Sequence, residues 1–209
     1  MSVENEDTGG AAGDGGDPTY EEADDARATE LLEANGVDTS RASLVSLLTG
    51  GGSGVLRGAA ARALGARNEM TAVDDLLEVA RTSDDLLRAE AAFATARMGV
   101  AEGLYLLKKC LAAPVAASLG APTAAGFLAR LGDPSGWSVV VEALKQDNFL
   151  IRIVGAKQLL YFVPFHGPSA DVYGAFGRAL GDDEEDVRAV AHIELRQLDD
   201  PRASALLAQ

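Results

Sequence analysis

The feature that most constrains the fold of this 209-residue chain is a short motif that occurs five times. The copies align on five anchor positions, which are Arg57, Arg88, Ala121, Arg152 and Arg188. The steps between successive anchors are 31, 33, 31 and 36 residues. Self-similarity at a period of about thirty residues is typical of solenoids, in which every unit is one supersecondary element stacked on the next.

Each copy of the motif has small and apolar residues at the same helical spacing. Small pairs lie three and four positions after the anchor: Ala60-Ala61, Ala91-Ala92, Ala124-Ala125, Gly155-Ala156 and Ala191-His192. Seven positions after the anchor stand Leu64, Thr95, Leu128, Leu159 and Leu195. This spacing predicts one buried face on each helix, with small side chains where a neighbouring helix approaches closely.

A second amphipathic segment follows each copy after a turn, as residues 72–79 and 137–144 illustrate. Each unit is therefore a helix–turn–helix that cannot bury its apolar face alone, whereas a stack of units can. Strand-like alternation of polar and apolar residues never takes over. The sequence predicts an all-α fold, an α-solenoid in the form of a right-handed superhelix of about five to six helical pairs.

The chain divides into two parts. Residues 1–17 contain almost nothing to bury, and we interpret them as a disordered acidic tail. Residues 18–209 are predicted to form the repeat domain, with repeats anchored near residues 57, 88, 121, 152 and 188. Upstream of the first anchor, a helix near residues 20–33 and another near 39–48 are predicted as a degenerate first pair.

The pattern Arg-x-x-Ala-Ala-x-x-Leu-x-x-Leu-Gly-Asp-Pro resembles the short HEAT repeats of the phycobilisome-lyase-like class, over roughly residues 54–208. The resemblance is specific for the fold but says little about the function, because that class includes lyases, hydroxylases, DNA glycosylases and many plain scaffolds. It implies a non-catalytic adaptor or scaffold that binds proteins, with a signalling or motility assembly as one setting. The alternative that it leaves open is a lyase-like enzyme subunit or a chaperone for a small cofactor.

The charge of the chain restricts its partners. It has 32 acidic and 18 basic residues, a formal net charge of −14 and a pI near 4.5. Such a field repels phosphate backbones and anionic lipid, so we expect neither nucleic acid nor a membrane as partner. Only four of the basic residues are lysine, a bias that resembles proteins of salt-accumulating halophiles, although a GC-rich mesophile is the alternative. Without a signal peptide or a long apolar segment, a cytoplasmic location is expected.

We find no motif for catalysis, a cofactor or a metal, and we expect the protein not to be an enzyme. His166 and His192 are followed by glycine and isoleucine, so the His-Glu pairs of the di-iron hydroxylases are missing. Cys110 lies among leucines and is predicted to be a buried core residue. The glycine-rich residues 50–54 lack the lysine of a P-loop, and the acidic residues 182–186 lack the ligand spacing of a calcium loop.

Two features of the middle repeats are candidates for a protein-binding surface. The first consists of all four lysines together with one arginine: Lys108, Lys109, Lys145, Lys157 and Arg152. They form either a cationic window for an acidic partner or a set of solubilising surface charges. The second consists of Tyr161, Phe165 and His166, which fall outside the repeat register and either form a binding hot spot or fill a gap in the stack. The chain itself is expected to be a monomer or to self-associate weakly.

Overall fold

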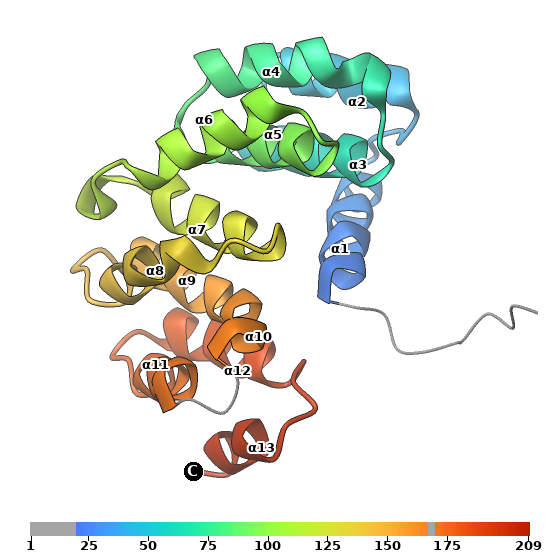
Figure 1. The fold of residues 1–209 in the computed structure, drawn as a ribbon. Helices are drawn as coiled ribbons and strands as arrows, with labels where there is room; N and C mark the ends of the chain where they lie inside the picture. Colours follow the sequence, from blue (N-terminus) through green and yellow to red (C-terminus); the bar gives the residue numbers. More distant parts are fainter. Residues whose placement is uncertain (1–19, 167–169) are drawn as a thin grey trace, which may run out of the picture.

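The computed structural model describes residues 20–166 and 170–209. These residues form the helices α1 to α13, joined by turns and short 3-10 segments, and they contain no strand (Figure 1). The all-α solenoid predicted from the sequence is therefore confirmed. The predicted acidic tail at residues 1–17 lies outside the described residues.

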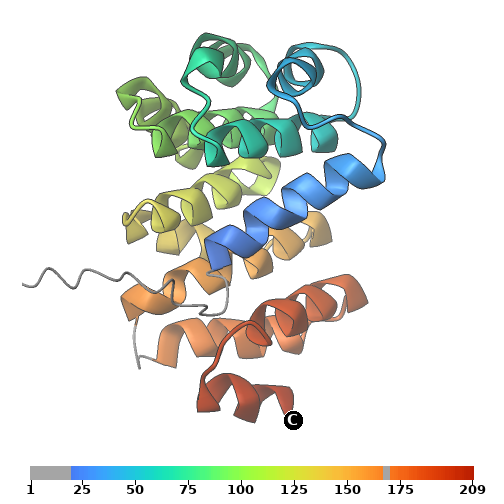
Figure 2. The ribbon, with the colours of Figure 1, turned by 90° about the vertical axis from the view of Figure 1, so that its right-hand side faces the viewer.

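Most helices belong to one of two stacked layers (Figures 1 and 2). The inner layer consists of α3 (Gly54–Ala66), α5 (Asp85–Arg97), α7 (Gly120–Arg130), α9 (Phe149–Gln158) and α12 (Glu185–Leu195). The outer layer consists of α2 (Arg41–Thr49), α4 (Val73–Thr82), α6 (Ala101–Leu111), α8 (Trp137–Ala143), α11 (Ala170–Leu180) and α13 (Pro201–Leu207). A 3-10 turn, η4 (Leu159–Phe162), and the short α10 (Val163–His166) follow α9. The five anchors of the sequence motif all lie at the start of inner helices.

Small and apolar residues at the predicted register build the core between the layers. The five residues seven positions after the anchors, from Leu64 to Leu195, are completely buried. Inner helices approach closely where small residues meet, and a Cβ atom added to Gly65 of α3 would lie only 2.8 Å from the Cα atom of Ala94 in α5. Close approach of this kind is what ridge-into-groove packing with small side chains permits.

The arginines that mark four repeats bind carbonyl groups at the end of the preceding helix or in the turn before their own. The bonds join Arg57 to Leu48 O, Arg88 to Ser83 O, Arg152 to Gln146 O and Asp147 O, and Arg188 to Asp182 O and Asp183 O, with lengths between 2.7 and 2.9 Å. They satisfy acceptors that helix geometry leaves open. In the third repeat, where Ala121 stands at the anchor, Asp85 of α5 instead accepts bonds from Ser118 Oγ and Gly120 N, at 2.9 and 2.7 Å.

Helix α7 separates two hydrophobic cores. The first core extends from α1 to α7 and includes Ala124 and Phe127, whereas the second extends from α7 to α13 and includes Ala125 and Ala129. Phe127 stacks on Phe93 of α5 with ring centroids 4.2 Å apart. The alternating faces of one helix thus connect the two halves of the stack.

The first helix, α1 (Tyr20–Ala34), does not stack as one member of a leading pair. It packs on α3 and runs diagonally across the inner helices, as Figure 2 shows. Ala28 and Leu32 of its C-terminal half are buried in the first core, which fixes that half beside α3. Within the described part of the chain, no helix is long and apolar enough to cross a membrane.

Candidate functional site

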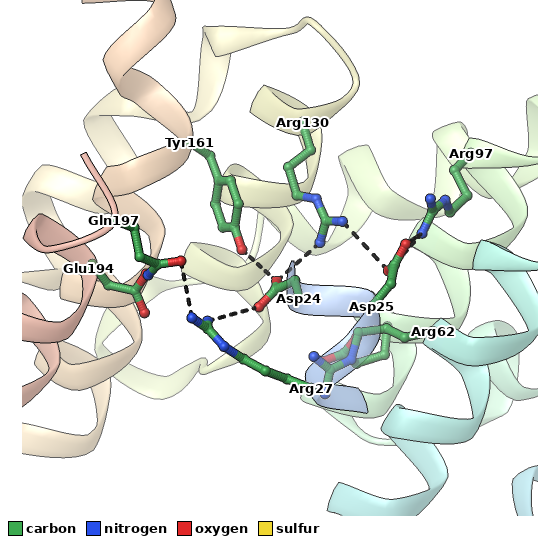
Figure 3. A network of polar contacts seen from close by, with 10 residues as sticks. Asp24, Asp25, Arg27, Arg62, Arg97, Arg130, Tyr161, Glu194 and Gln197 are labelled. Atoms are coloured by element: carbon green, nitrogen blue, oxygen red, sulfur yellow. Dashed lines mark hydrogen bonds and ion pairs between the residues drawn. The ribbon is translucent and has the colours of Figure 1, made fainter. Parts of the chain in front are cut away.

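The N-terminal half of α1 lies against a row of polar side chains at, or just beyond, the C-terminal ends of four inner helices (Figure 3). The row consists of Arg97, Arg130, Tyr161 and Gln197, which stand nine positions after the anchors of successive repeats. Because the repeats stack in register, one position of the motif becomes one line along the inner surface. We call this line, together with Arg62, Glu90, Lys157 and Glu194, the inner groove.

Arg130 is the most deeply buried charge of the inner groove. Its side chain is only 1% exposed, and its guanidinium lies 4.6 Å from the ring centroid of Phe93 and 5.3 Å from that of Tyr161. Two carboxylates of α1 balance the charge, since Arg130 lies 3.2 Å from Asp24 and 3.8 Å from Asp25. A buried arginine requires such partners, because an unpaired charge in this environment is strongly destabilising.

Asp24 connects three elements of the inner groove from its position on α1. It is 3% exposed and accepts hydrogen bonds from Arg130 and from the Tyr161 hydroxyl. Burial by itself would raise the pKa of Asp24, but Lys157, the Tyr161 hydroxyl and Arg130 together hold this pKa below its ordinary value. Burial, reinforced by the Asp24 charge, raises the pKa of Tyr161 far above that of a free tyrosine. The pair is therefore a carboxylate and a neutral phenol at neutral pH.

Ion pairs extend the contact of α1 to both sides of Asp24. Asp25 accepts two bonds from Arg97, at 3.0 and 2.9 Å. Arg27 lies 3.6 Å from Asp24 and donates a bond of 3.0 Å to Gln197, which in turn binds Glu194. The first helix is thereby attached to α5, α7, η4 and the turn after α12.

A cavity of about 200 Å³ remains between α1 and the inner helices. Asp24, Arg62, Glu90, Lys157 and Gln158 contribute polar groups to its lining. Arg62 Nε and Glu90 Oε2 form an ion pair of 3.2 Å, yet neither atom has a hydrogen-bond partner, and Gln158 Oε1 also has none. Burial raises the pKa of Glu90 and likewise that of Glu194 nearby. Unsatisfied polar groups therefore gather at the part of the groove that α1 does not fill.

The structure does not gather the four lysines on one surface. Lys108 and Lys109 lie on the outer helix α6, where Lys108 pairs with Asp133 at 3.1 Å. Lys145 follows α8 and pairs with Glu142 at 3.7 Å, whereas Lys157 lies on the inner helix α9 and lines the cavity. Closeness in sequence was misleading because successive helices of a solenoid alternate between the two layers.

The other predicted binding residues occupy different environments. Arg152 is engaged within the chain, since it binds Asp182 at 2.9 Å besides the carbonyl groups of its turn. Tyr161 is 8% exposed, which agrees with the gap-filling interpretation, while Phe165 is 40% exposed. His166 ends α10, and its side chain lies outside the described part of the structure. Whether any of these residues contacts a partner stays a prediction.

The cysteine and two of the aspartates that the sequence offered as candidates for catalysis or metal binding are engaged in packing or in ion pairs within the chain. Cys110 is buried, and burial raises the pKa of its thiol to about 11. Asp182 and Asp183 of the acidic run both bind Arg152. Across residues 20–166 and 170–209, no cluster of three or more histidine, cysteine, aspartate or glutamate residues could hold a metal ion.

The sequence argument singled out Tyr161 and Lys157 but missed the other residues of the inner groove. The signal was present, because Arg97, Arg130, Tyr161 and Gln197 repeat at one register position. Polar side chains at that position of an otherwise apolar helix indicate its solvent-facing or ligand-facing side. Their partner Asp24 lies in a segment without the motif, so the sequence offered no signal for its place.

Comparison with known proteins supports the repeat assignment. Residues 41–119, which extend from the start of α2 to the residue before α7, match the family model described as HEAT repeats. A comparison with the curated proteins found no match.

Proposed function

Because the chain is a HEAT-like repeat protein, we propose that it is a non-catalytic adaptor that binds another protein along its inner groove. HEAT repeats generally mediate protein–protein interaction, and the extended inner surface of a solenoid is the part that suits an elongated partner. The groove is proposed as the contact surface because it carries arginine and aromatic side chains, which are enriched in binding hot spots.

One observation carries the proposal: the inner groove already binds a helix of the same chain through side-chain contacts. Arg97 and Arg130 form hydrogen-bonded ion pairs with the carboxylates of α1, as arginines do with acidic groups across protein interfaces. A cofactor chaperone is less well supported. The cavity of about 200 Å³ is smaller than the sites of about 300–1,000 Å³ that hold drug-sized ligands.

The assembly in which the adaptor acts is a separate part of the proposal. A cytoplasmic signalling or motility apparatus is the setting we propose, and it rests on the resemblance of the repeats alone. The excess of 32 acidic over 18 basic residues supports a protein rather than a nucleic acid as partner.

Site-specific photo-crosslinking tests the adaptor function and the face that it uses. We would place p-benzoylphenylalanine at Val55, which lines the cavity and is 59% exposed, in the full chain in native extract. The matched control carries the same group at Tyr105 of the outer helix α6, which is 61% exposed. We expect one protein to be crosslinked from Val55 and not from Tyr105. If neither position captures a protein, the adaptor function is wrong, and capture from Tyr105 alone would move the contact to the outer layer.

A further inference from the structure

We propose that the N-terminal half of α1 is an internal substitute for the partner, which carries an acidic helical segment and displaces it from the inner groove. The inference rests on the proposed adaptor function and specifies both its partner and its regulation. It follows from the charges of the groove, from the way α1 is attached and from the space that α1 leaves.

The charges of the inner groove favour an acidic segment. Its cationic side chains are Arg62, Arg97, Arg130 and Lys157. It has two carboxylates: Glu90 pairs with Arg62, and Glu194 accepts a bond from Gln197. The described part of α1 that faces them presents two adjacent carboxylates. The net positive charge of the groove attracts acidic partners by electrostatic complementarity. The rest of the surface repels such partners, because the chain as a whole has a net charge of −14.

The attachment of α1 has two parts of different chemistry. Asp24, Asp25 and Arg27 hold its N-terminal half by ion pairs and hydrogen bonds, while Ala28 and Leu32 hold its C-terminal half by apolar packing. An acidic helix from another protein can replace the first set of contacts, because it offers the same carboxylates to the same arginines. The apolar half keeps α1 near the groove after its N-terminal half has been displaced, so the displacement is reversible. The tethered N-terminal half then competes with the partner helix at a high effective concentration.

The fit of α1 to the groove is incomplete. Lys157 lines the cavity and helps to lower the pKa of Asp24, but it forms no close ion pair with a described carboxylate. Gln158, which is 4% exposed, also contributes to the lining, and its Oε1 atom has no hydrogen-bond donor. A partner helix that placed a further carboxylate near Lys157 and a further donor near Gln158 would add contacts that α1 does not make, so it can bind better than α1 does.

Competition between the internal helix and an added one tests the inference. The probe is a fluorescein-labelled peptide of residues 20–36, and its control is the same peptide with asparagine in place of Asp24 and Asp25. The receptor is the full chain with Asp24→Asn and Asp25→Asn, whose own α1 is weakened, and binding is measured by fluorescence anisotropy. We expect the native peptide to bind this variant at least about tenfold more tightly than it binds the wild-type chain, and more tightly than the control peptide does.

Two arginine variants make the test specific for the groove. Arg97→Gln, added to the receptor, is expected to weaken peptide binding about tenfold, since it removes the partner of Asp25. Arg81→Gln on the outer helix α4, whose arginine pairs with Glu102, is expected to leave binding unchanged. Equal binding of both peptides, or equal loss with both arginine variants, would overturn the inference.

Hydrogen exchange on the wild-type chain gives a second measurement that does not depend on the variants folding. The partner crosslinked from Val55 is expected to speed exchange at the amides of residues 24–27 and to be released by the native peptide. If that partner binds without either effect, the adaptor function stands and the displacement of α1 is wrong. If no partner is found but the peptide binds as expected, the groove recognises acidic helices and the adaptor function alone fails.

Discussion

The anchor arginines show how one residue can define a repeat without contacting a ligand. Each stands near the start of an inner helix and donates to carbonyl groups at the end of the preceding segment. The guanidinium group suits this position because it offers several donors in a fixed plane. Arg152 makes the most extensive set of these contacts, since it binds two carbonyl groups as well as Asp182 and Asp183.

Replacing Arg152 is therefore expected to affect stability first. Arg152→Met keeps much of the apolar stem but leaves two carbonyl groups without this donor and Asp182 without its ion-pair partner, and we expect a loss of about 2–4 kcal/mol in the free energy of unfolding. Arg81→Met, which removes a 44% exposed ion pair, is expected to cost about 0–1 kcal/mol. Urea unfolding followed by circular dichroism measures both. A loss below 1 kcal/mol for Arg152→Met would show that these bonds contribute little.

At the scale of the element, α1 combines apolar anchoring with charged recognition. Its helical register places Ala28 and Leu32 in the first core beside α3, whereas Asp24 and Asp25 reach α7 and α5. If the N-terminal half detaches, water can solvate Arg130. The loss of unfolding free energy on removing Asp24 therefore cannot exceed the free energy needed to detach this half of α1. Apolar packing thus holds the C-terminal end of α1, whereas ion pairs that water can replace hold its N-terminal end.

The contribution of Asp24 is expected to depend on pH in a defined direction. Its pKa is lower in the folded than in the unfolded chain, so its stabilisation is present above about pH 4 and is lost as the pH falls through the folded-state pKa. Asp24→Asn is expected to lower the free energy of unfolding by about 1–3 kcal/mol at pH 7. The difference from wild type should narrow steadily below pH 4 in urea titrations. Asp147→Asn, on an exposed turn, serves as control, and a difference that stays constant with pH would contradict the assignment.

For the whole molecule, α1 supplies contacts that a simple solenoid does not have. Repeats of a solenoid contact only their neighbours, and their stability is approximately a sum over adjacent units. The bonds from α1 to Arg130, Tyr161 and Gln197 instead join residues 106, 137 and 170 positions apart. They connect the first hydrophobic core with the second and therefore couple the two halves of the stack.

Removing this coupling is expected to separate the unfolding of the two halves. Trp137, the only tryptophan, packs at the second core and lies 5.3 Å from the Phe162 ring, so its fluorescence reports on that half. In wild type, fluorescence and far-ultraviolet circular dichroism should give the same urea midpoint. In the double variant Asp24→Asn, Arg27→Gln the midpoints should differ by about 0.5 M or more, given m values of about 1–3 kcal/mol/M.

A matched pair of exposed substitutions controls for the change in charge. The double variant Glu33→Gln, Arg41→Gln also removes one acidic and one basic side chain, but both lie on the surface near the first core. Its two midpoints should coincide. Coincident midpoints in the Asp24 and Arg27 variant as well would show that the inner helices alone couple the halves.

The sequence by itself determined the solenoid, its register and much of its core. The small pairs, apart from the half-buried His192, and the residues seven positions after each anchor are buried as predicted, because burial along a helix follows from local periodicity. Cys110 was correctly predicted to be a core residue for the same reason. Periodicity did not reveal which helix of each pair faces inward, since both carry an apolar and a polar stripe.

Only the tertiary structure decided where α1 lies and which charges meet. Asp24 and Tyr161 are 137 positions apart, and no periodic pattern connects a segment outside the repeats with the helices that it crosses. The lysines illustrate the converse, since they are close in sequence but divided between outer and inner layers. Local spacing fixes the faces of helices, whereas a polar groove arises from the stacking of whole repeats and from the long-range contact of a helix that does not belong to them.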